Sequence, residues 1–158
     1  LEGCLITKMP KNPRHRLVTQ LTREALAALL PDGWYVDAQE PITLANSEPE
    51  PDVVIVRGNR RDYPDRHPGA EEIGLIVEVA DSTLKRDQTA KKKVYAAAQI
   101  PVYWIINLSD NRIEIYRQPT EINQQADYVQ KTHYGVDDVI NVDLDDQEIG
   151  QINVSDLL

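Results

Sequence analysis

The chain has 158 residues, of which 41% are hydrophobic and 27% charged, a composition that fits one globular domain with a real core. Its one cysteine, Cys4, excludes an internal disulfide framework and a thiolate metal site, and it fits a reducing compartment. The formal net charge of −9 argues against a broadly basic nucleic-acid surface, although basic residues cluster locally.

The first ten residues, LEGCLITKMP, lack the apolar region of a signal peptide. The chain does not begin with Met, which leaves open whether residues precede Leu1. No apolar run approaches the roughly 18 residues that would indicate a membrane span. We therefore expect a cytoplasmic protein without a membrane segment.

The first predicted element is a helix with clear boundaries. Asn12 can act as its N-cap, Pro13 suits the first helical position, and the tripeptide PDG at 31–33 ends it. A stripe of apolar residues marks the face that we expect to be buried. It consists of Leu17, Val18, Leu21, Ala25, Leu26 and Leu29.

Strands are predicted in the next part of the chain. Residues 34–44 (WYVDAQEPITL) form one or two strands, and 52–58 (DVVIVRG) is apolar and β-branched enough to be covered on both faces. Residues 59–72 form a polar loop, in which we expect the most flexible segment. A second buried strand follows at 73–80 (IGLIVEVA).

The second half continues with a helix and more strands. Residues 81–100 predict a helix capped near Asp81 or Ser82, and Pro101 follows its end. A third apolar strand, 102–108, pairs with 111–118 through the turn SDN, and the tail suggests short strands with a closing apolar turn. This order predicts an α/β fold, bordering on α+β, in which helices flank one mixed central sheet.

Two acidic residues stand out at the apolar strands. Strand alternation places Glu78 on one face with Ile76 and Ala80, where an ionised carboxylate is costly unless it is paired or binds a metal. Asp52 begins the preceding apolar strand, so the two carboxylates converge at one sheet edge if the strands are neighbours. Together with a main-chain carbonyl such as that of Val79, they would form a hard oxygen site that suits Mg²⁺.

The following helix carries Asp87, Lys91 and Tyr95 at intervals of four residues, so they share roughly one face. Lys91 can reach back toward Glu78, and the small Ala80 leaves room for it. A lysine there would orient or help deprotonate the attacking water and offset charge on a pentavalent phosphate. Asp87 would hold Lys91 in place.

These residues carry a family resemblance. PD at 51–52 and EVA at 78–80, ahead of a lysine-bearing helix, resemble the PD-(D/E)XK nuclease superfamily. Residues 75–108, LIVEVADSTLKRDQTAKKKVYAAAQIPVYWIINL, are similar to the bacterial restriction endonuclease family called Uma-two, which reads V-E-V-x-S-x-S-T, then D-x-x-x-K-x-x-x-Y-A, then G-V-x-E-Y-W-I-V-D. The early EGCLITKMPKNPRHRLV at 2–18 resembles that family's N-terminal pattern, a Gly-containing turn, a polar stretch and His.

The resemblance covers most of the chain and implies one restriction-endonuclease-like domain, residues 1–158. It also implies metal-dependent hydrolysis of DNA phosphodiester bonds, with Mg²⁺, or Mn²⁺, as cofactor. Asp52 matches the first acid and Glu78 the second, and Lys91 matches a lysine that has moved from the strand position held here by Ala80. Small nucleases of this fold often form homodimers, so we expect one by analogy.

Three positions depart from the Uma-two pattern. The usual Gly before the YWI strand is Gln99 or Ile100 here, the usual acid before Tyr is Val102, and Asn107 replaces the usual Asp. We interpret these differences as structural, because none of them touches the proposed site.

Each candidate also has a structural interpretation. Asp52 can be a turn residue, Glu78 an ion-pair partner of Lys91 or Arg86, and Lys91 a solvated lysine like its neighbours at 92–93. Pro64-Asp65 is an internal control, because no strand follows this second Pro-Asp, and we interpret it as loop. His15 fits a solvated or capping role, with contact to a substrate phosphate as the alternative.

The leading hypothesis is therefore a metal-dependent endonuclease acting on DNA. The alternative, motivated by the charge of −9, is a non-catalytic interaction protein with a nuclease fold. RNA or nucleotide hydrolysis by the same residues is a third, weaker hypothesis. No base-reading module is recognisable, so the sequence defines no DNA target.

Overall fold

The structure is a computed structural model that describes residues 12–122 and 125–158. Its elements are α1 (Pro13–Leu29), β1 (Trp34–Asp37), β2 (Val53–Arg57), η1 (Arg60–Asp62), η2 (Ala70–Glu72), β3 (Ile73–Ala80), α2 (Leu84–Arg86), η3 (Asp87–Lys91), α3 (Lys92–Ala97), β4 (Val102–Asn107), β5 (Arg112–Ile122), β6 (Gln125–Gly135), β7 (Val139–Leu144), β8 (Gln147–Asn153) and η4 (Val154–Asp156). Cys4 and residues 2–11 of the N-terminal pattern lie outside the described residues.

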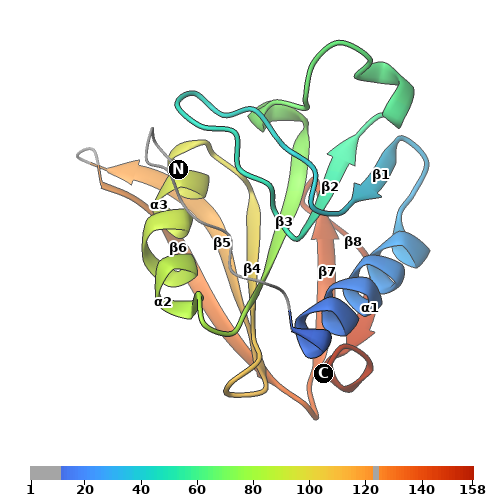
Figure 1. The fold of residues 1–158 in the computed structure, drawn as a ribbon, viewed down its shortest axis with the longest axis vertical. Helices are drawn as coiled ribbons and strands as arrows, with labels where there is room; N and C mark the ends of the chain where they lie inside the picture. The colour runs from blue at the N-terminus through green and yellow to red at the C-terminus, as the bar shows by residue number, and fades with distance from the viewer. Residues whose placement is uncertain (1–11, 123–124) are drawn as a thin grey trace.

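A six-stranded mixed sheet in the order β1-β2-β3-β4-β5-β6 forms the centre of the fold (Figure 1). Only β3 and β4 are parallel among its neighbouring strands, and the helical segment from α2 to α3 makes the crossover that a parallel pair requires. The other neighbours pair antiparallel. This confirms the predicted mixed central sheet flanked by helices.

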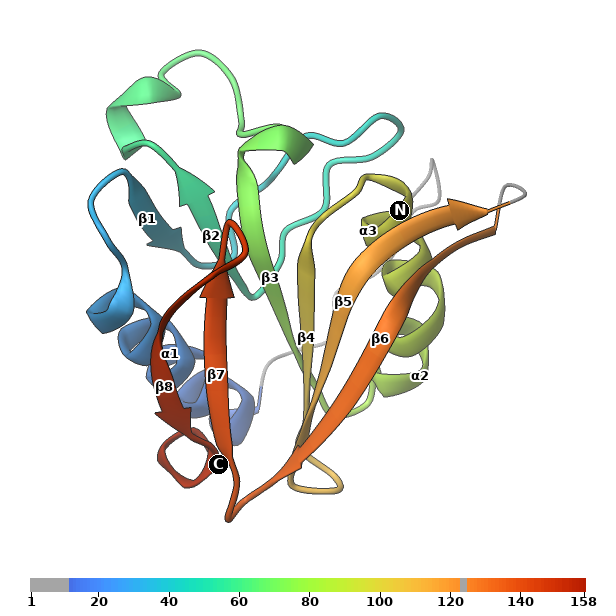
Figure 2. The same cartoon turned by 180° about the vertical axis from the view of Figure 1, so that it is seen from behind.

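Each face of the sheet has its own hydrophobic core. Leu75, Val77 and Val79 of β3 point to the side covered by α1 and by the hairpin of β7 and β8 (Figure 2). Ile76 and Ala80 point to the opposite side, which α3 covers. Because β3 is covered on both faces, all eight of its residues are buried, as its continuous apolar run predicted.

Helix α1 begins and ends as predicted, but its buried face differs from the predicted stripe. The Asn12 side chain accepts a hydrogen bond from the His15 N–H, and the helix ends at Leu29. Leu17 is 55% exposed, whereas Thr22 is fully buried and donates its hydroxyl proton to the Val18 carbonyl. The helix can bury Thr22 at little cost because this bond satisfies its hydroxyl.

The second helical segment starts later than predicted and is irregular. Thr83, rather than Asp81 or Ser82, is its N-cap residue, since the Asp81 carboxylate accepts a hydrogen bond from the Asn12 side chain instead. Its central turn, η3, has π-helical hydrogen bonding over Asp87–Lys91. Such turns occur mostly as short insertions in α-helices, frequently at functional sites.

The polar segment 59–72 contains two short 3₁₀ turns, η1 and η2, and Pro64-Asp65 lies between them in loop, as predicted. Arg66 forms an ion pair with Glu72 that ties the middle of this segment to its end. Its flexibility stays a prediction. Among the described residues, no helix has both the length and the apolar character needed to cross a bilayer.

Candidate active site

Asp52 and Glu78 meet at the edge where β2 begins and β3 approaches its end. The antiparallel register pairs Val53 with Val77, which sets the residues next to them, Asp52 and Glu78, opposite each other. The Asp52 N–H donates to Glu78 Oε1 at 3.0 Å, and the Val79 N–H donates to Asp52 Oδ2 at 2.8 Å. The structure thus brings together the two acids whose convergence depended on β2 and β3 being neighbours.

Lys91 reaches this pair from the π-helical turn. Its ammonium Nζ lies 2.6 Å from Glu78 Oε2 and 3.2 Å from Asp87 Oδ1, and only 18% of its side chain is exposed. The Tyr95 hydroxyl lies 3.3 Å from the same Glu78 oxygen. Lys92, by contrast, forms an ion pair with Asp127, so Lys91 is the lysine that joins the acids.

His15 joins the site from the first turn of α1, although the sequence favoured a solvated or capping role. Its Nε2 lies 3.3 Å from Asp52 Oδ2, and its side chain is only 14% exposed. Asn12 performs the capping instead. The signal that could have placed His15 here was the N-terminal pattern ending in His, because periodicity along α1 does not say what faces its first turn.

Burial has the largest effect on the pKa values of the acids in this cluster, and attraction to Lys91 opposes it. The carboxyl groups of Glu78 and Asp87 contact the Lys91 ammonium, and Asp52 lies beside Glu78. Burial raises the pKa of Glu78 to about 7, helped by the charges of Asp52 and Asp87 and opposed by Lys91. Burial likewise raises the pKa of Asp87. Without a bound cation, the cluster therefore takes up protons more readily than free carboxyl groups do.

The pKa values of Lys91 and Tyr95 are also raised, but for different reasons. Burial would lower the pKa of Lys91, but the Glu78 and Asp87 carboxylates outweigh it and raise that pKa above its ordinary value. Burial, with a contribution from Glu78, raises the pKa of Tyr95 well above 10. Lys91 is thus an ammonium and Tyr95 a neutral hydroxyl near neutral pH, and both donate toward Glu78.

Comparison with known proteins places this arrangement in a family. A family model named Uma2 and described as "Putative restriction endonuclease" matches residues 1–145. The chain belongs to the Uma2 family. This membership confirms the resemblance that the block from Glu78 to Trp104 carried.

The fold supports the same assignment. A crystal structure from Anabaena variabilis ATCC 29413, described as "a putative nuclease belonging to DUF820", matches this Uma2 chain with a TM-score of 0.70 and 13% sequence identity. The match covers 99% of this chain and 87% of the other, which confirms the predicted nuclease-like fold. No curated protein matches the chain.

The donor set of this Uma2 site fits a hard divalent cation. If all four groups are ionised, Asp52, Glu78 and Asp87 with Lys91 carry a net charge of −2, which one such ion would balance. Carboxylate oxygens are the ligands that Mg²⁺ prefers. Within residues 12–122 and 125–158, no three His, Cys, Asp or Glu side chains form a ready-made metal site. Water and a main-chain oxygen would have to complete the coordination, and the role of the Val79 carbonyl stays a prediction.

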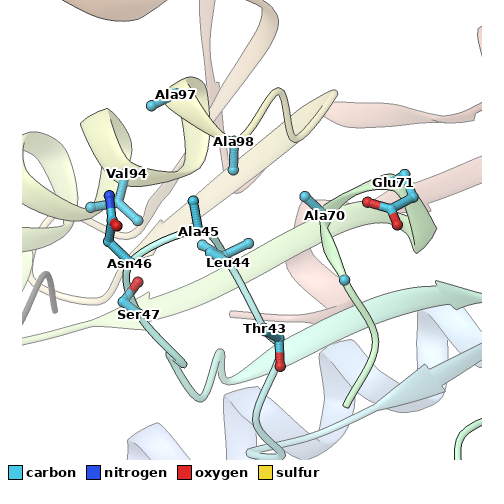
Figure 3. Close-up of a pocket in the computed structure, with 11 residues that line it drawn as sticks. Thr43, Leu44, Ala45, Asn46, Ser47, Ala70, Glu71, Val94, Ala97 and Ala98 are labelled. Atoms are coloured by element: carbon cyan, nitrogen blue, oxygen red, sulfur yellow. The ribbon is translucent and has the colours of Figure 1, made fainter. Parts of the chain in front are cut away.

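A separate hollow of about 470 Å³ lies between the 43–47 loop, η2 and α3 of the Uma2 fold (Figure 3). Its lining is mostly small or apolar, with Leu44, Val94 and Ala98 among its residues. Glu71 is the one ionisable side chain in that described lining. The hollow therefore lacks the paired acids and the lysine that distinguish the site around Glu78.

Proposed function

We propose that this chain is a divalent-cation-dependent endonuclease that hydrolyses phosphodiester bonds in DNA. Family membership and fold support a nuclease. The observation that carries the finer assignment is the contact of Lys91 with Glu78 beside Asp52, because acids and a lysine at one strand edge are the groups that metal-assisted phosphodiester hydrolysis needs. Asp52 and Glu78, with the carbonyl of Val79, would hold Mg²⁺ or Mn²⁺.

Each side chain then has a definite task. A bound divalent cation supplies Lewis-acid polarisation of the scissile phosphate. Lys91 orients the attacking water and offsets the negative charge that builds up on the phosphate oxygens. Tyr95 and His15 are positioning residues, since one contacts a Glu78 oxygen and the other an Asp52 oxygen.

Calorimetric titration with Mn²⁺, combined with plasmid nicking, tests this proposal. We expect one site in the wild type, no binding in Asp52→Asn, and unchanged binding in Asp65→Asn. Asp65 is a matched control because it belongs to the second Pro-Asp dipeptide of the chain and is exposed in a loop, away from Asp52 and Glu78. In the nicking assay, Lys91→Met should lose on the order of 10²–10⁴-fold in rate while it stays folded.

The competing function is a non-catalytic interaction protein, which the net charge of −9 and the ion pair between Lys91 and Glu78 favour, since that pair can also serve packing. A wild type that neither binds Mn²⁺ nor nicks plasmid would support that alternative and contradict the nuclease. Nicking by Glu78→Gln at the wild-type rate would also contradict the proposed nuclease site.

The predicted homodimer is part of the proposal. Two copies would allow two sites to act on the two strands of a duplex. Light scattering coupled to size-exclusion chromatography should give twice the chain mass, and a monomer at all concentrations would contradict this prediction.

A further inference from the structure

A hollow on the surface of α1 lies beside the candidate active site. It has a volume of about 370 Å³. One wall is α1, which contributes Arg16, Thr19, Gln20 and Arg23, and the other is the segment that follows β1, residues 37–39. Figure 1 shows α1 running beside β1 and β2.

The hollow and the candidate active site are joined through both walls. The Gln39 N–H donates to the Pro51 carbonyl at 2.9 Å, which ties the 37–39 segment to the residue before Asp52. On the other wall, Arg16 follows His15, which contacts Asp52. Gln39 has a φ of 59°, an unfavourable conformation for a residue other than glycine, and such strain concentrates at functional sites.

The charges of this hollow are unusual for so acidic a chain. Arg16 and Arg23 are exposed and seven residues apart, so two turns of α1 place them on the same face. Across the described part of the chain, neither arginine forms an ion pair with a carboxylate. The one acid in the lining, Asp37, is already paired with Arg60 at 3.0 Å.

We propose that this hollow binds the phosphodiester backbone of the DNA strand that enters the active site, an inference that rests on the proposed function. Arginine suits phosphate because its planar guanidinium donates two parallel hydrogen bonds. Seven residues of α1 span about 10 Å. Phosphates of one strand advance about 3.4 Å along the duplex axis and lie farther apart than this because the strand winds around the axis, so we expect Arg16 and Arg23 to contact one phosphate each.

The test measures binding without cleavage. Fluorescence anisotropy of a short labelled duplex, in Ca²⁺ and over a series of salt concentrations, compares wild type with Arg16→Ala/Arg23→Ala. The control is Arg61→Ala/Lys93→Ala, which makes the same change in net charge at two exposed residues away from α1. Thermal melting of all three proteins verifies that each is folded.

We expect Arg16→Ala/Arg23→Ala to bind DNA on the order of ten-fold or more weakly than wild type. The slope of log affinity against log salt concentration should be smaller by about 1.8, which is 0.9 for each lost phosphate contact. The control should stay within about two-fold of wild type. In the nicking assay, Arg16→Ala/Arg23→Ala should have a higher KM and a nearly unchanged kcat, because neither arginine belongs to the catalytic centre.

Two results would contradict DNA binding at this hollow without contradicting the proposed nuclease. One is a wild-type DNA affinity and salt slope in Arg16→Ala/Arg23→Ala. The other is an equal loss of DNA affinity in the control variant. A wild type that does not bind duplex DNA at all would instead contradict the proposed DNA substrate, and with it the proposed role of the hollow.

Discussion

Replacing Glu78 by Gln should change how the stability of the metal-free protein depends on pH. The pKa of Glu78 rises from 4.5 to about 7 in the fold, mainly because the side chain is buried and 1% exposed. The folded state therefore binds more protons than the unfolded state between these values. The stability that neutral Glu78 contributes is present below pH 4.5 and is lost as pH rises through about 7.

The size of the effect follows from the change in the pKa of Glu78 between the unfolded and folded states. A pKa difference of about 2.5, at 1.36 kcal/mol per pKa unit, corresponds to about 3 kcal/mol of unfolding free energy. Gln has nearly the same shape and does not titrate, so the variant does not undergo this loss. Asp87 Oδ1 lies 3.2 Å from the Lys91 ammonium in the wild type, so we expect Lys91 to keep this partner in the variant.

Urea unfolding in a chelator at several pH values between about 4.5 and 8 measures the effect, with the fluorescence of Trp34 and Trp104 as reporter. The stability of Glu78→Gln relative to wild type should rise by about 3 kcal/mol across this range. Asp65→Asn should show no such trend. A difference that is constant with pH would refute the reasoning, and a trend of opposite sign would mean that the ionised carboxylate stabilises the fold.

Three further substitutions test two contacts of the candidate site and one of the core. His15→Ala should lower Mn²⁺ affinity about 10–100-fold in calorimetry, because it frees the Asp52 carboxylate to rotate, and unchanged affinity would contradict a positioning role. Tyr95→Phe should cost about 1 kcal/mol in urea unfolding by removing a donor to Glu78, and no loss would mean that the 3.3 Å contact is weak. Gly74→Ala should cost about 1–3 kcal/mol, since an added Cβ would lie 2.4 Å from a buried leucine methyl of β7, and wild-type stability would show that β7 yields.

Much of the fold could be predicted because its central strands have a strong local signal. The apolar runs of β2, β3 and β4 can be buried only in a sheet covered on both faces, and Asn12 marks the start of α1. The eleven-residue β6 was less clear, because its side chains are mostly exposed and its pairing with β5 comes from the hairpin rather than from hydrophobic alternation.

The candidate site could be predicted in part, for a different reason. A carboxylate within an apolar strand is conspicuous, so Glu78 was identifiable, and helical spacing selected Lys91. The contact of His15 with Asp52 depends on how α1 crosses the sheet, which local sequence does not encode. Leu17 shows the same limit, because α1 buries Thr22 once a backbone carbonyl satisfies its hydroxyl.

The π-helical turn has a consequence for how this chain can tolerate insertions and deletions. A π-helical turn contains one more residue than an α-helical turn. Deletion of one residue within 87–91 would therefore leave a regular α-helix. Because the π-helical turn accommodates its extra residue within itself, the helix on either side would keep nearly the same phase after this deletion. A deletion between Asp87 and Lys91 would change their spacing from four residues to three, which still places both side chains on one face of the helix. This segment should therefore tolerate the loss of one residue better than a regular α-helix would.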